Sequence, residues 1–176
     1  MSSNKVVIIS GDKGEGKTTK IVEIIDKLKR NDVAVTGFVA IGEWENGERS
    51  KYTMLDIRTG KSAVICTATM TNGYDKHGRF YFNPLAVKFG ENILYSQQNI
   101  SQVVVIDEIG PFELDGKVWH NSLLHHLENT QNLLLLSVRT KLVDEIVEKY
   151  TLANVSVYNT LANNDDIVKE IIQNVI

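Results

Sequence analysis

The hydrophobic residues of this chain fall into short apolar runs that alternate with segments of helical periodicity. Runs typical of buried strands cover 5–10, 33–41, 103–106, 133–136 and 155–158. Apolar positions at helical spacing predict helices over 18–30, 85–96, 118–127, 142–150 and 167–175. Strands that alternate with helices predict an α/β fold, with a doubly wound, mostly parallel sheet and right-handed crossovers.

The segment after the second predicted strand has a different pattern. Turn clusters at 45–48 and 58–61 bound two runs rich in β-forming residues, 52–57 and 62–67. We therefore expect antiparallel hairpin strands added to the edge of the parallel sheet. Residues 70–79 contain several Gly, Asn and Asp residues, which predict a loop. The whole pattern predicts a single domain over 1–176, with a hairpin insertion at about 42–80.

Composition narrows the function classes. With 43% hydrophobic and 23% charged residues, the chain is typical of a globular protein. Its net charge of −3 argues against a general nucleic-acid or membrane surface, and no apolar run approaches the roughly 18 residues that span a bilayer. The lone Cys66 has no disulfide partner in the chain, and the N-terminus lacks a signal-peptide core. We expect a cytoplasmic protein, and no protein partner is indicated.

A glycine-rich motif lies between the first predicted strand and the first predicted helix. Residues 11–18 read GDKGEGKT, which fits the Walker A spacing. Its glycines let several backbone N–H groups point at phosphate oxygens, and the positive end of the following helix reinforces them. Lys17 would reach the β- and γ-phosphates and act in catalysis, while Thr18 would be a ligand of Mg²⁺. The motif predicts nucleotide contacts from Gly11, Asp12, Lys13, Gly14, Glu15, Gly16, Lys17, Thr18 and Thr19.

An apolar run that ends in two carboxylates completes the pattern. Val103 to Ile106 precede Asp107 and Glu108, and we expect this strand to lie next to the P-loop strand. Asp107 would then hold Mg²⁺ through water, and Glu108, just outside the strand, would orient or deprotonate the attacking water. Alone, such a run would favour a helix N-cap at the end of a strand. Paired with the Walker A motif, it indicates a Walker B strand.

The segment Asp107–Leu114, DEIGPFEL, resembles the DEIG-x-[ML]-EL segment of the small nucleoside-triphosphatases first known from thermophiles, a family shared with a human cancer-related nucleoside-triphosphatase. Weaker similarities at 36–38, 47–49, 56–57 and 159–172 extend the resemblance over nearly the whole chain. Residues 42–45 lack the family's usual Glu-Val-Arg, and Pro111-Phe112 replaces its Lys-Met or Pro-Met, while Glu113 is kept.

This resemblance implies a P-loop NTPase fold, a RecA- or kinase-like three-layer sandwich, and Mg²⁺-dependent hydrolysis of ATP, GTP and other triphosphates to diphosphate and phosphate. It also implies nucleotide contacts along the second motif, from Val105, Ile106, Asp107, Glu108, Ile109, Gly110, Pro111 and Phe112.

Several further side chains are candidates at such a site. Arg139 ends a predicted strand, so it would emerge where ligands bind, whereas Arg49 and Arg79 lie in segments that could fold over the site. Because the sequence places no arginine firmly at the γ-phosphate, we expect slow turnover. We expect Trp44, Trp119 and Phe112 to anchor the core rather than stack on a base, and His120, His125 and His126 to be surface or packing residues.

Two other functions share these motifs. A nucleotide or small-molecule kinase would usually carry clustered arginines, whereas the five arginines here are scattered along the sequence. A nucleotide-dependent switch would use the same catalytic residues, but a guanine-specific one needs an Asn/Thr-Lys-x-Asp motif, and Thr140-Lys141 is followed by Asp144 one residue too late.

Overall fold

Successive residues of the central strands face different hydrophobic cores on the two sides of one sheet. The computed structural model describes residues 2–96 and 98–175, and only the backbone of residues 2 and 3. Within these residues the sheet has nine strands: β1 (Ser2–Ser10), β2 (Val35–Glu45), β3 (Glu48–Asp56), β4 (Ser62–Thr67), β5 (Asp75–His77), β6 (Phe80–Phe82), β7 (Val103–Ile109), β8 (Leu133–Val138) and β9 (Leu152–Asn159).

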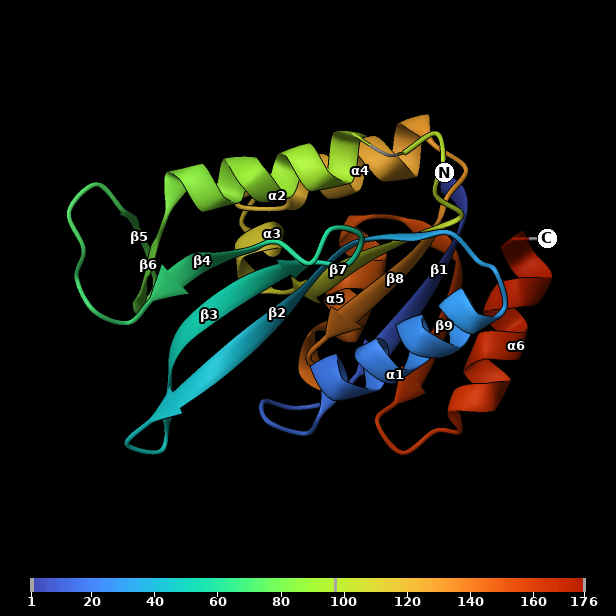
Figure 1. Ribbon diagram of the computed structural model, residues 1–176, viewed down its shortest axis with the longest axis horizontal. Coiled ribbons are helices and arrows are strands. Elements are labelled where there is room, and N and C mark those ends of the chain that lie inside the picture. Colours follow the sequence, from blue (N-terminus) through green and yellow to red (C-terminus); the bar gives the residue numbers. More distant parts are fainter. Residues whose placement is uncertain (1, 97, 176) are drawn as a thin grey trace.

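Helices cover both faces of this sheet, as Figure 1 shows. They are α1 (Lys17–Arg30), α2 (Pro84–Ser96), α3 (Pro111–Leu114), α4 (His120–Asn129), α5 (Val143–Lys149) and α6 (Asn164–Val175), and a 3₁₀ turn at Thr140–Leu142 precedes α5. On β1, Val6 and Ile8 pack in the core that holds residues of α2, α4 and α5, whereas Val7 and Ile9 pack in the core of α1 and α6. The predicted three-layer α/β arrangement is confirmed, and burial on both faces explains the unbroken apolar runs.

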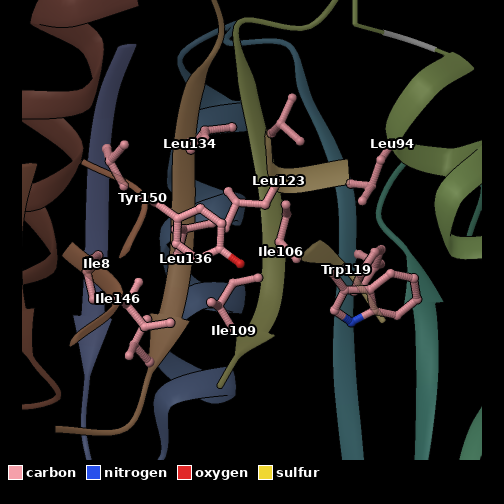
Figure 2. Close-up of a cluster of buried hydrophobic side chains, with 14 of the residues drawn as sticks. Ile8, Leu94, Ile106, Ile109, Trp119, Leu123, Leu134, Leu136, Ile146 and Tyr150 are labelled. Atoms are coloured by element: carbon pink, nitrogen blue, oxygen red, sulfur yellow. The ribbon is translucent and has the colours of Figure 1, made fainter. Parts of the chain in front are cut away.

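The core under α2, α4 and α5 supports the strands that carry the predicted site. Figure 2 shows Ile106 and Ile109 of β7 beside Leu134 and Leu136 of β8, with Trp119 packed at one end. These strand residues are fully buried. Side-chain packing in this core therefore helps to fix the carboxyl ends of β7 and β8.

The strand order is β5-β6-β4-β3-β2-β7-β8-β1-β9. The pairs β2–β7, β7–β8, β8–β1 and β1–β9 are parallel, whereas β2–β3, β3–β4, β4–β6 and β6–β5 are antiparallel. This arrangement confirms a mostly parallel core with hairpin strands added at one edge. Figure 1 shows the β2–β3 hairpin projecting away from the helices at its tip.

Two local predictions are wrong, and one short helix has no counterpart among the predicted elements. Residues 70–79 were expected to form a loop but contain β5, which pairs with β6. The strand expected over 33–41 begins at Val35 and continues to Glu45, because its outer half pairs with β3 rather than turning early. The short helix α3 follows Gly110, where the sequence pattern gave no helix, since four residues are too few for a periodic signal.

Candidate active site

The loop between β1 and α1 has the backbone geometry that phosphate binding requires. Gly14 and Gly16 have φ angles of 84° and 89°, in the left-handed region that favours glycine. Helix α1 begins directly after them at Lys17, so its positive end points into the loop. The N–H of Gly11 donates to the carbonyl of Val138 at 3.3 Å, which fastens the start of the loop to the end of β8.

Lys17 places its ammonium group inside this loop. The residue is only 6% exposed, and its Nζ donates to the carbonyl of Asp12 at 3.2 Å. The same Nζ lies 3.8 Å from Oε2 of Glu108. The ammonium group therefore sits between the loop and the end of β7, where a triphosphate tail would be held.

Asp107 and Thr18 bring two hard oxygen atoms together. Oγ1 of Thr18 donates to Oδ2 of Asp107 at 2.8 Å, and the same oxygen accepts from the N–H of Ala40 at 3.1 Å. Ser137 donates to the other carboxylate oxygen. Burial raises the pKa of Asp107, which is 2% exposed, although these hydrogen bonds act in the opposite direction. A hydroxyl and a carboxylate, with phosphate oxygens nearby, form a donor set that fits Mg²⁺.

Two details of the predicted second motif need correction. The strand β7 does not lie beside the P-loop strand, because β8 is inserted between β7 and β1. Glu108 is not outside the strand but within β7, where the register with β8 shifts between Ile106 and Ile109. Asp107 still meets Thr18, since all three strands are parallel and end at the same edge of the sheet.

Glu108 has cationic partners on two sides. Its Oε1 accepts from Nε of Arg139 at 3.1 Å, while Oε2 faces the ammonium of Lys17. The side chain of Glu108 is 27% exposed, so it can meet a water molecule. Arg139 thus lies at the carboxyl edge of the sheet, as predicted, and its side chain contacts the carboxylate of Glu108.

A cleft of about 760 Å³ opens over these groups. Many predicted nucleotide contacts line it: Lys13, Gly14, Gly16, Lys17, Thr18, Thr19, Asp107, Glu108, Gly110, Pro111, Phe112 and Arg139. Gly11, Asp12 and Glu15 belong to the loop but do not line the cleft. The side chains of Val105, Ile106 and Ile109 are fully buried in the two cores, so they support the site from below.

Sequence reasoning gave the wrong environment for one tryptophan. Trp119 is 4% exposed and anchors the core as expected, but Trp44 is 52% exposed and lines the cleft. The Trp44 ring lies 4.2 Å from Cζ of Arg49 and 5.7 Å from Nζ of Lys13. It therefore joins the β2–β3 hairpin to the phosphate loop through cation–π contacts.

Two contributors were missed, Ser137 and the buried state of Glu113. A signal for Ser137 was present in the sequence, because this polar residue directly follows four leucines in β8, a strand that is buried throughout. Glu113 is 2% exposed, and its carboxylate accepts from the N–H groups of Gly110 and Trp119 at 2.8 and 3.2 Å. Burial raises its pKa to about 8.

The three histidines predicted to be surface or packing residues have partners outside the phosphate loop. His120 bonds Tyr150, His125 bonds Gln98, and His126 is fully buried against the carbonyl of Leu94. In the described part of the chain, no three His, Cys, Asp or Glu side chains gather closely enough to hold a metal ion by themselves. Nor does any helix in 2–96 or 98–175 have the length and apolarity to cross a membrane.

A parallel sheet with a glycine-rich loop before α1, and with a buried aspartate facing the Thr of that loop, defines a P-loop nucleotide-binding protein. The profile of the family described as NTPase matches residues 6–173, and the chain belongs to this family.

Curated relatives and solved structures agree with this assignment. The nucleoside-triphosphatase THEP1 of Saccharolobus solfataricus is 32% identical over 77% of both chains, and that of Caldivirga maquilingensis is 24% identical over 94% of this chain and 92% of its own. The crystal structure of THEP1 from Aquifex aeolicus superposes with a TM-score of 0.70 at 21% identity, covering 97% of this chain and 98% of that one. The solution structure of a human cancer-related nucleoside triphosphatase gives 0.69 at 22% identity, covering 97% and 96%. The fold predicted from the sequence is therefore the fold of this family.

Proposed function

We propose that this chain hydrolyses nucleoside 5′-triphosphates, ATP and GTP among them, to the diphosphate and phosphate in a Mg²⁺-dependent reaction. The observation that carries the proposal is the meeting of Lys17 and Thr18 with Asp107 and Glu108 at one edge of the sheet. Curated relatives over most of the chain's length are named nucleoside-triphosphatases. We take 1–176 as one catalytic domain, with the hairpin strands as its insertion.

Each group has a role that follows from its position. The N–H groups of the loop and the ammonium of Lys17 bind and orient the triphosphate, because they form a concave cationic surface at the start of α1. Thr18 and Asp107 would hold Mg²⁺, which supplies positive charge to the β- and γ-phosphate oxygens. Glu108 accepts a hydrogen bond from the attacking water and takes its proton, since it is the partly exposed carboxylate nearest the ammonium.

The arrangement also supports slow turnover. Arg139, the arginine closest to the catalytic groups, is paired with Glu108, and a cation engaged there gives less charge to the transferring phosphoryl group. An arginine directed at that group contributes about 10³–10⁵ in rate. We therefore expect turnover well below the typical median of about 10 s⁻¹.

The test is release of inorganic phosphate from ATP, GTP, CTP and UTP, with and without Mg²⁺, by the wild type and by Lys17→Ala and Glu108→Gln. We expect both variants to lose most activity, by about 10²-fold or more, and Glu108→Gln still to bind nucleotide.

Matched controls are Lys27→Ala, on the outer part of α1, and Glu145→Gln, which is exposed on α5. These should retain wild-type rates. Full activity in Glu108→Gln would remove its role as the base, and full activity in Lys17→Ala would refute the site itself.

A further inference from the structure

The cleft continues well beyond the phosphate loop. The part lined by the hairpin strands and the segment after β7 is here called the inner cleft, and its lining includes Tyr52, Ile65, Phe80, Phe82, Phe112 and Trp119. Hydrolysis needs room for one water molecule beside the terminal phosphate. The whole cleft has a volume of about 760 Å³, within the range of small-molecule sites, and the phosphate loop lines only one part of it. The inner cleft therefore extends beyond the groups that hydrolysis uses.

The inner cleft lies on the side where the terminal phosphate would point. The pair Thr18–Asp107 is the place for the ion that bridges β- and γ-phosphates, and it sits at the end of β7. The next strands outward are β2, β3, β4 and β6, and the last three carry four of the six inner-cleft residues. A molecule held there would approach the γ-phosphate from beyond the triphosphate tail, past Glu108.

The lining chemistry selects a planar, apolar occupant. Phe82 and Phe112 pack edge to face with centroids 5.0 Å apart, and Tyr52 and Phe80 do so at 5.5 Å. Aromatic edges and faces of this kind favour another ring between or beside them. Trp119, almost fully buried, closes one wall.

Charge at the cleft favours a neutral occupant. Arg49, Arg79 and Arg139 are far apart in the sequence but all line the cleft, so the absence of an arginine cluster in the sequence no longer argues against a phosphotransferase. Each arginine already has a partner: the carbonyl of Gly42 for Arg49, the carboxylate of Glu48 for Arg79, and Glu108 for Arg139. An acidic group on the occupant is therefore not required.

We propose that the inner cleft is an acceptor site for a small, neutral, ring-bearing alcohol, and that the chain transfers the terminal phosphoryl group of a nucleoside triphosphate to its hydroxyl group. This rests on the proposed function, because it uses the same bound triphosphate. The hydroxyl oxygen forms a bond to the γ-phosphorus, and the bond from that phosphorus to the β–γ bridging oxygen breaks. The hydroxyl proton passes to the carboxylate of Glu108, and the nucleoside diphosphate leaves.

The experiment uses γ-³²P-labelled ATP with Mg²⁺ and, in separate reactions, benzyl alcohol, 2-phenylethanol, 3-(hydroxymethyl)pyridine and tryptophol. Chromatography separates labelled phosphate esters from inorganic phosphate. We expect an ester with at least one alcohol, formed in equal amount with the additional ADP. In Phe80→Ala the ratio of ester to inorganic phosphate should fall by roughly tenfold, because an apolar wall of the acceptor site is lost.

Tyr81→Ala is the matched control, since Tyr81 neighbours Phe80 on β6 but does not line the cleft; it should keep the wild-type ratio. Binding is measured separately in Trp44→Phe, which leaves Trp119 as the sole tryptophan. Its emission should change on titration with 2-phenylethanol.

The outcomes separate the two proposals. Phosphate release from ATP with no ester from any alcohol and no change in Trp119 emission would overturn the acceptor site and leave the hydrolase intact. Faster phosphate release without an ester would also overturn the transfer. Absence of both ester and inorganic phosphate would overturn the proposed function as well.

Discussion

Ser137 donates a hydrogen bond to Oδ1 of Asp107 across the junction of β8 and β7. Both residues are almost completely buried, and their strands are adjacent and parallel. The other carboxylate oxygen, Oδ2, faces Thr18 of the phosphate loop. The strand inserted between β7 and the P-loop strand thus supplies the hydroxyl that fixes the orientation of the carboxylate. With Oδ1 held by Ser137, Oδ2 of Asp107 is directed toward Thr18, although β8 separates β7 from the P-loop strand.

Replacing that hydroxyl should affect both stability and ligand binding. In Ser137→Ala one oxygen of a buried carboxylate loses its donor, so we expect the free energy of unfolding to fall by about 1–3 kcal/mol. Mg²⁺–nucleotide affinity should weaken several-fold, measured by calorimetric titration. The control is Ser122→Ala, because the Ser122 hydroxyl on α4 is buried and has no hydrogen-bond partner among the residues that the structure describes. If Ser122→Ala were as harmful as Ser137→Ala, the effect would not come from Asp107.

Arg139→Gln tests whether this arginine acts on the phosphate or on Glu108. Because Arg139 contacts the carboxylate of Glu108, we expect the catalytic rate to fall by about 10²-fold or less, well short of the 10³–10⁵ for a cation on the transferring phosphoryl group. The measurement is steady-state phosphate release, with Arg58→Gln, an exposed arginine in the β3–β4 turn, as control. A loss of 10⁴-fold would instead assign Arg139 to the phosphate.

Gly37 is required where β2 approaches β7. Its φ angle is 100°, and a Cβ atom placed there would lie 2.0 Å from the carbonyl oxygen of Val105. We expect Gly37→Ala to reduce the free energy of unfolding by more than about 3 kcal/mol or to prevent folding, because backbone atoms must move apart. Gly60→Ala is the control: its φ is also positive, at 70°, but no atom lies within 4 Å. Urea denaturation should show a loss of only about 1–2 kcal/mol there.

Glu113 should make stability fall as pH rises. Its pKa is raised from 4.5 to about 8 by burial, so the folded state holds a proton that the unfolded state releases above pH 4.5. Stability is therefore greatest below the unfolded pKa and declines by up to about 1.4 kcal/mol per pH unit until the folded pKa is passed.

In Glu113→Gln this contribution to the slope between pH 5 and 8 should disappear. The amide nitrogen cannot accept the N–H bond that a carboxyl oxygen accepts, so we expect the variant to be less stable than the wild type at pH 5 and closer to it at pH 8. Urea midpoints at the two pH values measure this. Parallel pH dependence in both proteins would contradict the assignment.

The alternation of strands and helices could be predicted because buried positions carry apolar residues, and the spacing of these residues differs between strands and helices. The runs at β1, β7 and β8 are apolar on both faces, and the periodicity of α1 reflects a single buried side. The strand β5 escaped prediction because Asp75 to His77 are polar or exposed, and its pairing with β6 depends on contacts within the folded edge. The insertion of β8 between β7 and β1 is a matter of topology, which local patterns do not encode.

The candidate site likewise contains residues whose positions could be predicted from the sequence and residues whose positions could not. Lys17, Thr18 and Asp107 were predictable because phosphate binding demands fixed residue types at fixed spacing, and the structure places them together. The position of Trp44 could not be predicted, because a tryptophan side chain by itself does not show whether it packs in a core or lies on a hairpin beside the phosphate loop. The convergence of Arg49, Arg79 and Arg139 on one cleft arises only when the hairpin strands extend the sheet beyond β7.

The position of β1 between β8 and β9 has a consequence for protein synthesis. Both hydrogen-bonding edges of β1 are filled by strands that begin at Leu133 and Leu152. A nascent chain therefore carries the phosphate loop out of the ribosome with no neighbour for its strand until β8 and β9 have been translated. Unpaired strand edges are prone to association with other chains. Until those two strands emerge, β1 consequently needs protection, and the phosphate loop lacks the neighbouring strands that support it.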